Sequence, residues 1–306
     1  MHVILKRFHS EESGQIIVLV AISMVMLFGL GALAADIGRL YLERQRLTAA
    51  ADIAAISAVQ FLPDKVAAEQ AARDYLEKNG VDASAATIVV NETDKEVGVM
   101  VNNTIPMTFA RMLGSDREGT FGDALARIDN LSGVFGAAPL GVARADWQVG
   151  ERVILKLSAN DGTVAPGNYQ ALALGKSGAS MYEYNLMNGY QDWIRIDQWI
   201  QTETGNMANP TVRACEYRIS LDPMATWETV TKGSARLLKV PVLESFEVNG
   251  KGEVLVVGFA MFFLEDVRET GSNKGEIIGR FLRGVVEGEA NGSAPDFGLK
   301  TVKLVR

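Results

Sequence analysis

The stretch IIVLVAISMVMLFGLGALAA, residues Ile16–Ala35, contains no charged side chain. As an α-helix it rises about 1.5 Å per residue and reaches about 30 Å, which is the thickness of the hydrocarbon core of a bilayer. It is too long for the apolar part of an ordinary secretory signal, and no small-x-small cleavage site leads from it into a loop. The sequence therefore predicts one transmembrane span over residues 16–35.

The helical pattern continues past the span to about Val59, and no proline or glycine interrupts it after Gly38. Small residues spaced four apart lie on one helix face, where they let the backbone of another helix come close. We expect this face to pack against the protein's own domain or against a neighbouring chain. The small residues concerned are Gly31, Ala34, Ala35, Gly38, Ala50, Ala54 and Ala58.

Asp36 comes directly after the span, where placing a carboxylate in hydrocarbon is costly. Arg39 follows three residues later, and residues at this spacing are neighbours on a helix. We expect the two side chains to pair at the membrane surface and to anchor the helix there. The alternative is that Asp36 meets a cation on a partner helix in an assembly.

Several features of the first sixty residues occur together. A short arm ends at Gly14, the apolar span follows, and Asp36 comes just after it. A Gly-Arg-Leu-Tyr element begins at Gly38, and an Arg-x-Leu-x-x-Ala-Ala-Asp run begins at Arg46. This combination resembles the N-terminal segment of TadG-like proteins, the Flp or Tad pilus assembly family. The resemblance implies a membrane-anchored extracytoplasmic component of a pilus or secretion apparatus, without enzymatic activity.

Two motifs of related proteins are missing. Type IV pilins and pseudopilins carry Glu at the fifth position after a glycine, whereas Leu19 holds that position after Gly14. The sequence therefore does not predict cleavage by a prepilin peptidase. Larger TadG proteins carry an Asp-x-Ser-x-Ser metal site, and the nearest string here, Asp82, Ser84 and Ala86, lacks the last hydroxyl. We expect no metal site there.

Composition excludes several classes of function. The net charge is −7 and no cluster of basic residues occurs, which argues against a nucleic-acid partner. The single cysteine, Cys215, excludes an internal disulfide and is expected to be a buried structural thiol. Both histidines, His2 and His9, precede the span, so the large domain has no Ser-His-Asp triad and no His-ligated zinc. We expect no cofactor.

The charges that flank the span do not fix its orientation. Lys6 and Arg7 precede it and three arginines between residues 39 and 46 follow it, so a count of basic residues places the C-terminal side inside the cell. That rule weakens when a long domain follows the span. On the resemblance, we expect a single-pass protein of the cytoplasmic membrane. Residues 1–15 would form a cytoplasmic arm, and the C-terminal domain would be extracytoplasmic.

Residues 60–128 are predicted to form a small α+β module. Pro63 ends the long helix because its ring cannot continue the helical pattern. A second helix is predicted over residues 64–78 and stops at Asn79-Gly80. Two strands that begin near Ala86 and Glu96, and a short amphipathic helix over residues 105–113, complete the module.

A connection over residues 129–138 precedes a predicted β-rich domain, residues 139–306, so the expected fold class is α+β. The apolar run over residues 254–264 is too short to span a membrane as a helix and predicts a buried central strand. Further expected elements are a tight hairpin at Asn249-Gly250, a helix from Asn209 to about Ile219, and strands near residues 152, 169, 240, 277 and 298.

We expect a non-catalytic assembly component whose small residues, Asp36 and Arg39 contact pilin-like or pilus-assembly membrane helices, or a second copy of the chain. One alternative is an envelope-anchored hydrolase that uses two carboxylates, and another is an adhesin or cell-wall-binding module with an aromatic patch. The candidate carboxylates are Glu203, Glu265, Asp266, Glu287 and Glu289, and the aromatic patch comprises Tyr182, Tyr184, Tyr190, Trp193 and Trp199.

Overall fold

The computed structural model describes residues 3–93, 95–144, 148–157, 168–203, 207–245, 251–269 and 275–305. The chain divides into two compact units. The N-terminal unit comprises Met1–Arg127 and Leu304–Arg306, and the C-terminal unit comprises Ile128–Lys303. The two are described separately below.

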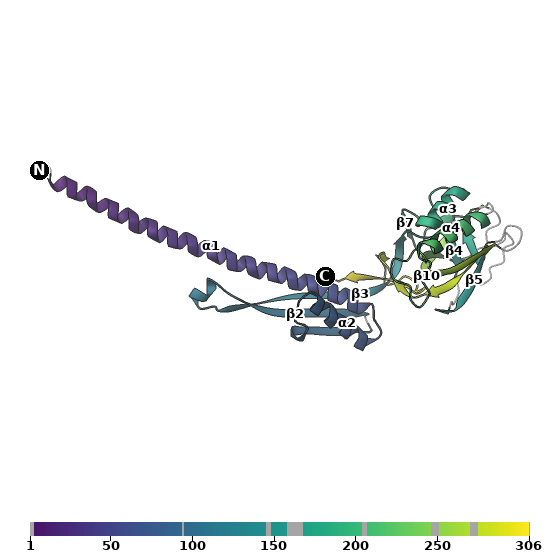
Figure 1. Ribbon diagram of the computed structural model, residues 1–306, viewed down its shortest axis with the longest axis horizontal. Coiled ribbons are helices and arrows are strands. Elements are labelled where there is room, and N and C mark those ends of the chain that lie inside the picture. The colour runs from purple at the N-terminus through teal and green to yellow at the C-terminus, as the bar shows by residue number, and fades with distance from the viewer. Residues whose placement is uncertain are drawn as a thin grey trace. The chain divides into compact units, whose positions relative to one another are not determined.

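The N-terminal unit is built on one long helix, α1, which runs from Val3 to Val59 (Figure 1). The predicted continuation of the helix beyond the span is therefore confirmed, and the stretch predicted as an arm is already helical from Val3. Large apolar side chains are exposed on α1 throughout the predicted span. Among the described residues, α1 is the one helix that is long and apolar enough to cross a membrane.

The alanine-rich end of α1 is buried inside the N-terminal unit. It packs against α2 (Lys65–Lys78) and β2 (Glu96–Pro106). The predicted second helix is confirmed, and Asp64 is its N-cap, because the Asp64 carboxylate accepts a hydrogen bond from the backbone N–H of Ala67 at 3.0 Å. The residues of α1 that are buried in this contact are Leu47, Ala50, Ala51, Ala54, Ala55, Ala58 and Val59.

A β-hairpin follows α2 and runs alongside α1 (Figure 1). It consists of β2 and the first part of β3 (Arg117–Phe135), and β1 (Ala86–Asn91) pairs with the outer side of β2. A Cβ atom on Gly122 would overlap the backbone of Leu47, so glycine is required where β3 crosses α1.

The helix predicted over residues 105–113 is wrong. The pairing of β2 with β3 continues to Pro106, which faces Arg117, and this ladder keeps the backbone extended. Only Ala110–Leu113 form a helical turn, the short 3₁₀ helix η2; a second turn of this kind, η1, covers Ala83–Ala85.

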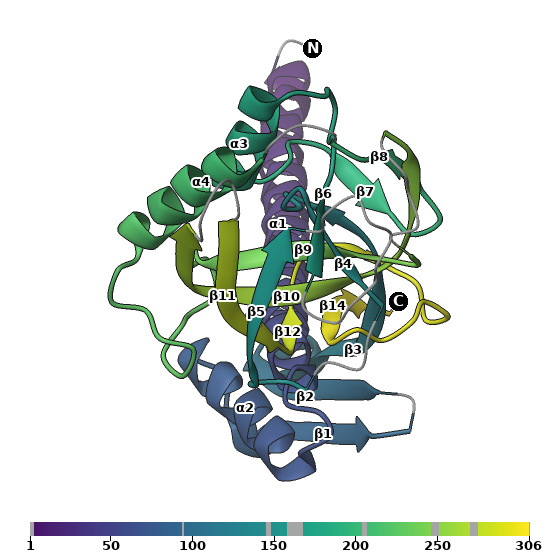
Figure 2. The ribbon, with the colours of Figure 1, turned by 90° about the vertical axis from the view of Figure 1, so that its right-hand side faces the viewer.

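The C-terminal unit contains a sheet that closes on itself (Figure 2). Its strand order is β11-β5-β6-β4-β9-β10, and β10 (Glu253–Glu269) also pairs with β11 (Gly275–Leu282). The predicted buried central strand is confirmed in β10, which has partners on both sides. The remaining strands of this closed sheet are β4 (Leu140–Ala143), β5 (Arg152–Leu157), β6 (Asn168–Ala171) and β9 (Leu237–Leu243).

Two helices, α3 (Ala179–Asn188) and α4 (Ala208–Leu221), pack against each other, and α4 packs on β10 (Figure 2). The sequence predicted α4 but did not predict α3. The helix expected to start with Asn209 begins one residue earlier, at Ala208, and the buried Met207 is its N-cap in place of the Asn209 side chain.

The stretch predicted as a connection, residues 129–138, is strand as far as Phe135, where β3 ends. In the C-terminal unit, β3 pairs with two short strands, β7 (Trp193–Arg195) and β13 (Glu289–Ala290). The hairpin predicted at Asn249-Gly250 lies outside the described residues. The other short strands are β8 (Trp199–Gln201), β12 (Gly284–Val285) and β14 (Leu299–Leu304).

Candidate functional site

The small residues predicted for helix packing fall into two groups. Gly31 and Ala35 are exposed and Gly38 is half-buried. A Cβ atom at Gly31 or Gly38 would meet nothing within 4 Å beyond the adjoining helix backbone, so the fold itself does not require glycine there. By contrast, Ala50, Ala54 and Ala58 are buried within their own unit and are not available to another chain.

The Asp36 carboxylate binds backbone of the same chain. It accepts hydrogen bonds from the N–H groups of Thr108 at 3.0 Å, Phe109 at 2.7 Å and Ala110 at 2.9 Å. The Nη1 atom of Arg39 donates to the Oγ1 atom of Thr108 at 3.1 Å. The predicted pairing of Asp36 with Arg39 is therefore wrong. Free N–H groups at the start of a helical turn are aligned donors for a carboxylate, and they occupy it instead.

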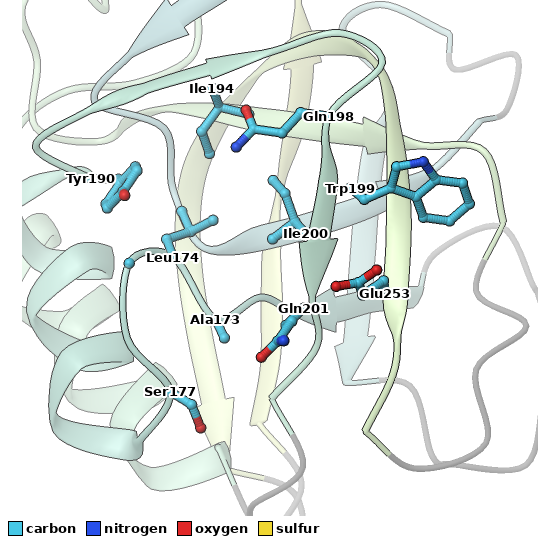
Figure 3. A pocket seen from close by; sticks show the side chains of 11 residues that line it. Ala173, Leu174, Ser177, Tyr190, Ile194, Gln198, Trp199, Ile200, Gln201 and Glu253 are labelled. Atoms are coloured by element: carbon cyan, nitrogen blue, oxygen red, sulfur yellow. The ribbon is translucent and has the colours of Figure 1, made fainter.

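The C-terminal unit contains a cavity of about 360 Å³ (Figure 3). Leu174, Ile194 and Ile200 give it an apolar floor, and all three are buried. Strand β8 and residues 173–177 border it, and the ring of Tyr190 lines it on the side away from β8 (Figure 3).

Polar side chains at the mouth of this cavity come from β8 and β10. Gln201 pairs directly with Glu253, so both side chains lie on one face of the two strands, together with Trp199. Trp199 is 60% exposed. Among the described residues, neither the Gln201 amide nor the Glu253 carboxylate has a protein partner. The opening thus combines an exposed aromatic ring with free hydrogen-bonding groups.

The structure separates the members of the predicted aromatic patch. Tyr182 is buried, and its hydroxyl is hydrogen-bonded to Thr211 Oγ1 at 2.8 Å. Trp193 is half-buried and its ring lies 6.2 Å from that of Phe135. Tyr184 is exposed on α3, whereas Tyr190 and Trp199 both line the cavity.

The predicted carboxylates do not converge on one cleft. Glu203 is 7% exposed and accepts a hydrogen bond from the backbone N–H of Gly178 at 2.7 Å, at the start of α3. Asp266 pairs with Arg268, and Glu287 is exposed. Of the described residues that line the cavity, Glu253 is the one carboxylate.

The remaining two candidate carboxylates, Glu265 and Glu289, are held in their ionised form by arginine side chains. Burial opposes ionisation of Glu265, but hydrogen bonds from Arg280 at 2.6 Å and Arg152 at 2.9 Å hold its pKa below the ordinary value. A hydrogen bond from Arg195 at 2.8 Å likewise lowers the pKa of Glu289. A general acid in glycoside hydrolysis needs a raised pKa, so these groups do not fit that role.

Cys215 is buried as predicted. Burial raises the pKa of its thiol to about 12, so that the reactive thiolate is not formed at neutral pH. Among the described residues, no group of His, Cys, Asp and Glu side chains is arranged to hold a metal ion.

The exposed apolar span of α1, the acidic residue just beyond it and the outward small residues together define the membrane end of the molecule. Residues 14–60 match the Tad family model. Its description is "Putative Flp pilus-assembly TadE/G-like". No curated protein and no solved structure matches the chain. The Tad segment, meaning residues 14–60, contains Asp36 and all the small residues predicted for packing, and the C-terminal unit lies outside the match.

Proposed function

We propose that the protein is a membrane-anchored, non-catalytic assembly component of a Tad-type pilus or secretion apparatus. The observation that carries this proposal is the match of the Tad segment, whose first half is an exposed apolar helix of membrane-spanning length. The N-terminus is cytoplasmic and the C-terminal unit is extracytoplasmic. The chain then acts by holding its C-terminal unit beside the other membrane helices of the apparatus.

The contact with those helices uses the face of Gly31 and Ala35, which are four residues apart and both exposed. Small residues at this spacing let two helix backbones pack closely in a membrane, where van der Waals contact drives association. Because Gly31 has free space around it within the chain, its lack of a side chain suits an external partner.

Bulky substitution on this face tests the proposal. We expect Gly31→Leu to stop the chain from co-purifying with the apparatus and to reduce pilus number, because the leucine side chain holds the helices apart. Gly29→Leu is the matched control: Gly29 is also surrounded by free space, and it lies about 200° around the helix from Gly31. Equal effects of the two substitutions, or normal pili with Gly31→Leu, would contradict the proposed contact face.

The cavity supports a second function for the C-terminal unit, the binding of a sugar ring from an envelope glycan. A flat sugar face stacks on an exposed aromatic ring such as Trp199, while hydroxyls bond to free groups such as those of Gln201 and Glu253. The volume of about 360 Å³ lies within the range of small-molecule sites.

Calorimetric titration of the full chain with soluble peptidoglycan fragments and neutral oligosaccharides tests this second function. We expect Trp199→Ala to weaken binding at least about fivefold, taking the stacking of a sugar face on Trp199 to be as strong as that of a nucleic-acid base on an aromatic side chain, on the order of 1–3 kcal/mol. Tyr184→Ala is the control because Tyr184 is comparably exposed, at 53%, and does not line the cavity. If none of these glycans binds the chain, or if both variants lose the same amount of affinity, this site is ruled out.

A further inference from the structure

We propose that the loop between β2 and β3, residues 107–116, makes a second contact with the bilayer, with the side chain of Met112 entering the lipid. The proposal rests on α1 crossing the membrane. It concerns the N-terminal unit alone, and it follows from the level at which Asp36 holds this loop on the helix.

The level of the loop is fixed by its hydrogen bonds. Asp36 is the first residue after the uncharged span, and its carboxylate holds the N–H groups of residues 108–110 at 2.7–3.0 Å. Side chains on a helix lean toward its N-terminus, which here is the direction of the membrane. The backbone of the loop therefore lies at the level where the hydrocarbon ends, and not further out from the membrane.

The burial of Ala32 supports the same level. Ala32 belongs to the span, yet it is only 8% exposed, whereas Leu33, Ala34 and Ala35 are exposed. It lies one turn before Asp36 on the same face of α1, which is the face that the loop occupies. A part of the span is thus already covered by the protein's own chain at the depth where lipid begins.

The loop carries the side chains that such a position needs. Met112 is 82% exposed, so the N-terminal unit does not cover its flexible apolar side chain. Its neighbour Arg111 forms an exposed ion pair with Asp116 at 3.1 Å, and an arginine beside lipid can extend its head to the water. On α1, Tyr41 is 62% exposed five residues beyond Asp36, as expected for an aromatic residue at the interface.

Fluorescent labelling of the full chain in lipid nanodiscs tests this contact. Cys215 is buried and leaves a cysteine introduced by Met112→Cys as the reactive thiol. Val66→Cys is the matched control, since Val66 on α2 is an equally exposed apolar residue, at 79%. Met26→Cys, within the span, reports membrane insertion. Nanodiscs of phosphatidylethanolamine and phosphatidylglycerol carry spin-labelled lipids that quench a probe in the membrane, and iodide quenches a probe in water.

We expect lipid quenching of the Met112 probe, stronger with a quencher near the headgroups than with one at the bilayer centre, and iodide quenching of the Val66 probe alone. Lipid quenching at Met26 with a Met112 probe that behaves like the Val66 probe would overturn the loop contact and leave the anchor intact. Absence of lipid quenching at Met26 would overturn the membrane anchor and the loop contact together. A Met112 probe shielded from both quenchers would also overturn the lipid contact, because it would show that protein covers the loop.

Discussion

Asp36 and Ala110 are 74 residues apart in the sequence, and the backbone N–H of Ala110 donates to the Asp36 carboxylate at 2.9 Å. This bond, with those from Thr108 and Phe109, ties the end of the β2–β3 hairpin to α1 just beyond the apolar span. The helix leaves the membrane and is immediately braced by its own domain. Its direction at the surface is therefore coupled to the position of the hairpin.

The first prediction concerns this brace. We expect Asp36→Ala to free the loop without unfolding the unit. The alanine-rich end of α1 stays buried against α2 and β2, and that contact does not involve Asp36. Hydrogen exchange should show the amides of Thr108, Phe109 and Ala110 losing at least about tenfold in protection, since each loses its acceptor. Asp116→Ala, which removes the carboxylate of an exposed ion pair in the same loop, should leave these three amides unchanged. Unchanged exchange in Asp36→Ala would show that the carboxylate does not hold the loop.

The second prediction concerns the crossing of β3 over α1. Gly122→Ala places a methyl group against the backbone of Leu47 and Thr48, which cannot move aside as a side chain can. We expect a loss of about 3 kcal/mol in the free energy of unfolding of the N-terminal unit, measured by denaturant titration in detergent. Gly119→Ala, on the same strand and with free space around it, should cost less than about 1 kcal/mol. Similar costs for both would mean that β3 does not approach α1 so closely.

The third prediction concerns Cys215. A thiol with a pKa of about 12 stays protonated at pH 8, and its side chain is fully covered. We expect a maleimide reagent to leave Cys215 unmodified in the native chain and to modify it once the chain is unfolded in denaturant. Rapid modification under native conditions, at a rate near that of a free thiol, would show that the core around α4 opens easily.

The fourth prediction concerns pH and the pair of helices α3 and α4. A hydrogen bond from Arg213 to Glu183, at 2.9 Å, lowers the pKa of that carboxyl below its ordinary value. The native state therefore favours the ionised form, and the stabilisation is present above the unfolded pKa and lost as pH falls through the lower, native pKa. We expect the difference in stability between the wild type and Glu183→Gln to be largest near neutral pH. It should shrink toward zero as the solution becomes acidic enough to protonate Glu183 in the native state.

Acid titration of the two proteins by circular dichroism measures this difference. Arg213→Gln should show the same narrowing, because it removes the other half of the pair. A stability difference that stays constant down to the most acidic conditions would contradict this prediction, because it would show that Glu183 does not stabilise the fold through its charge.

The elements that the sequence predicted best are those specified by their own residues. The length of α1 follows from uninterrupted helical spacing, and the central position of β10 follows from its apolar run over residues 254–264. Similarly, α2 contains its own signals, with Asp64 before it and Asn79-Gly80 after it.

The features that were missed depend on residues distant in the chain. No capping side chain precedes α3, because Gly178 is at its N-cap and Glu203 supplies the acceptor from 25 residues away. The Asp36 carboxylate and the N–H groups that it binds are even further apart in the sequence, by 72 to 74 residues. Pro106 stays in a strand because of its pairing with Arg117, and no local pattern in the sequence indicates that register. The cavity arises where β8 lies beside residues 173–177, which a linear pattern does not show.

The closed strand path of the C-terminal unit limits how the sheets of neighbouring copies could pair. Since β10 pairs with both β9 and β11, the ring of strands from β11 through β5, β6, β4 and β9 returns to its start. An open sheet edge would offer free backbone groups to any neighbouring copy held at the same height by a membrane anchor. Within the described residues, the six strands of this ring therefore offer a neighbouring copy no open edge to pair with.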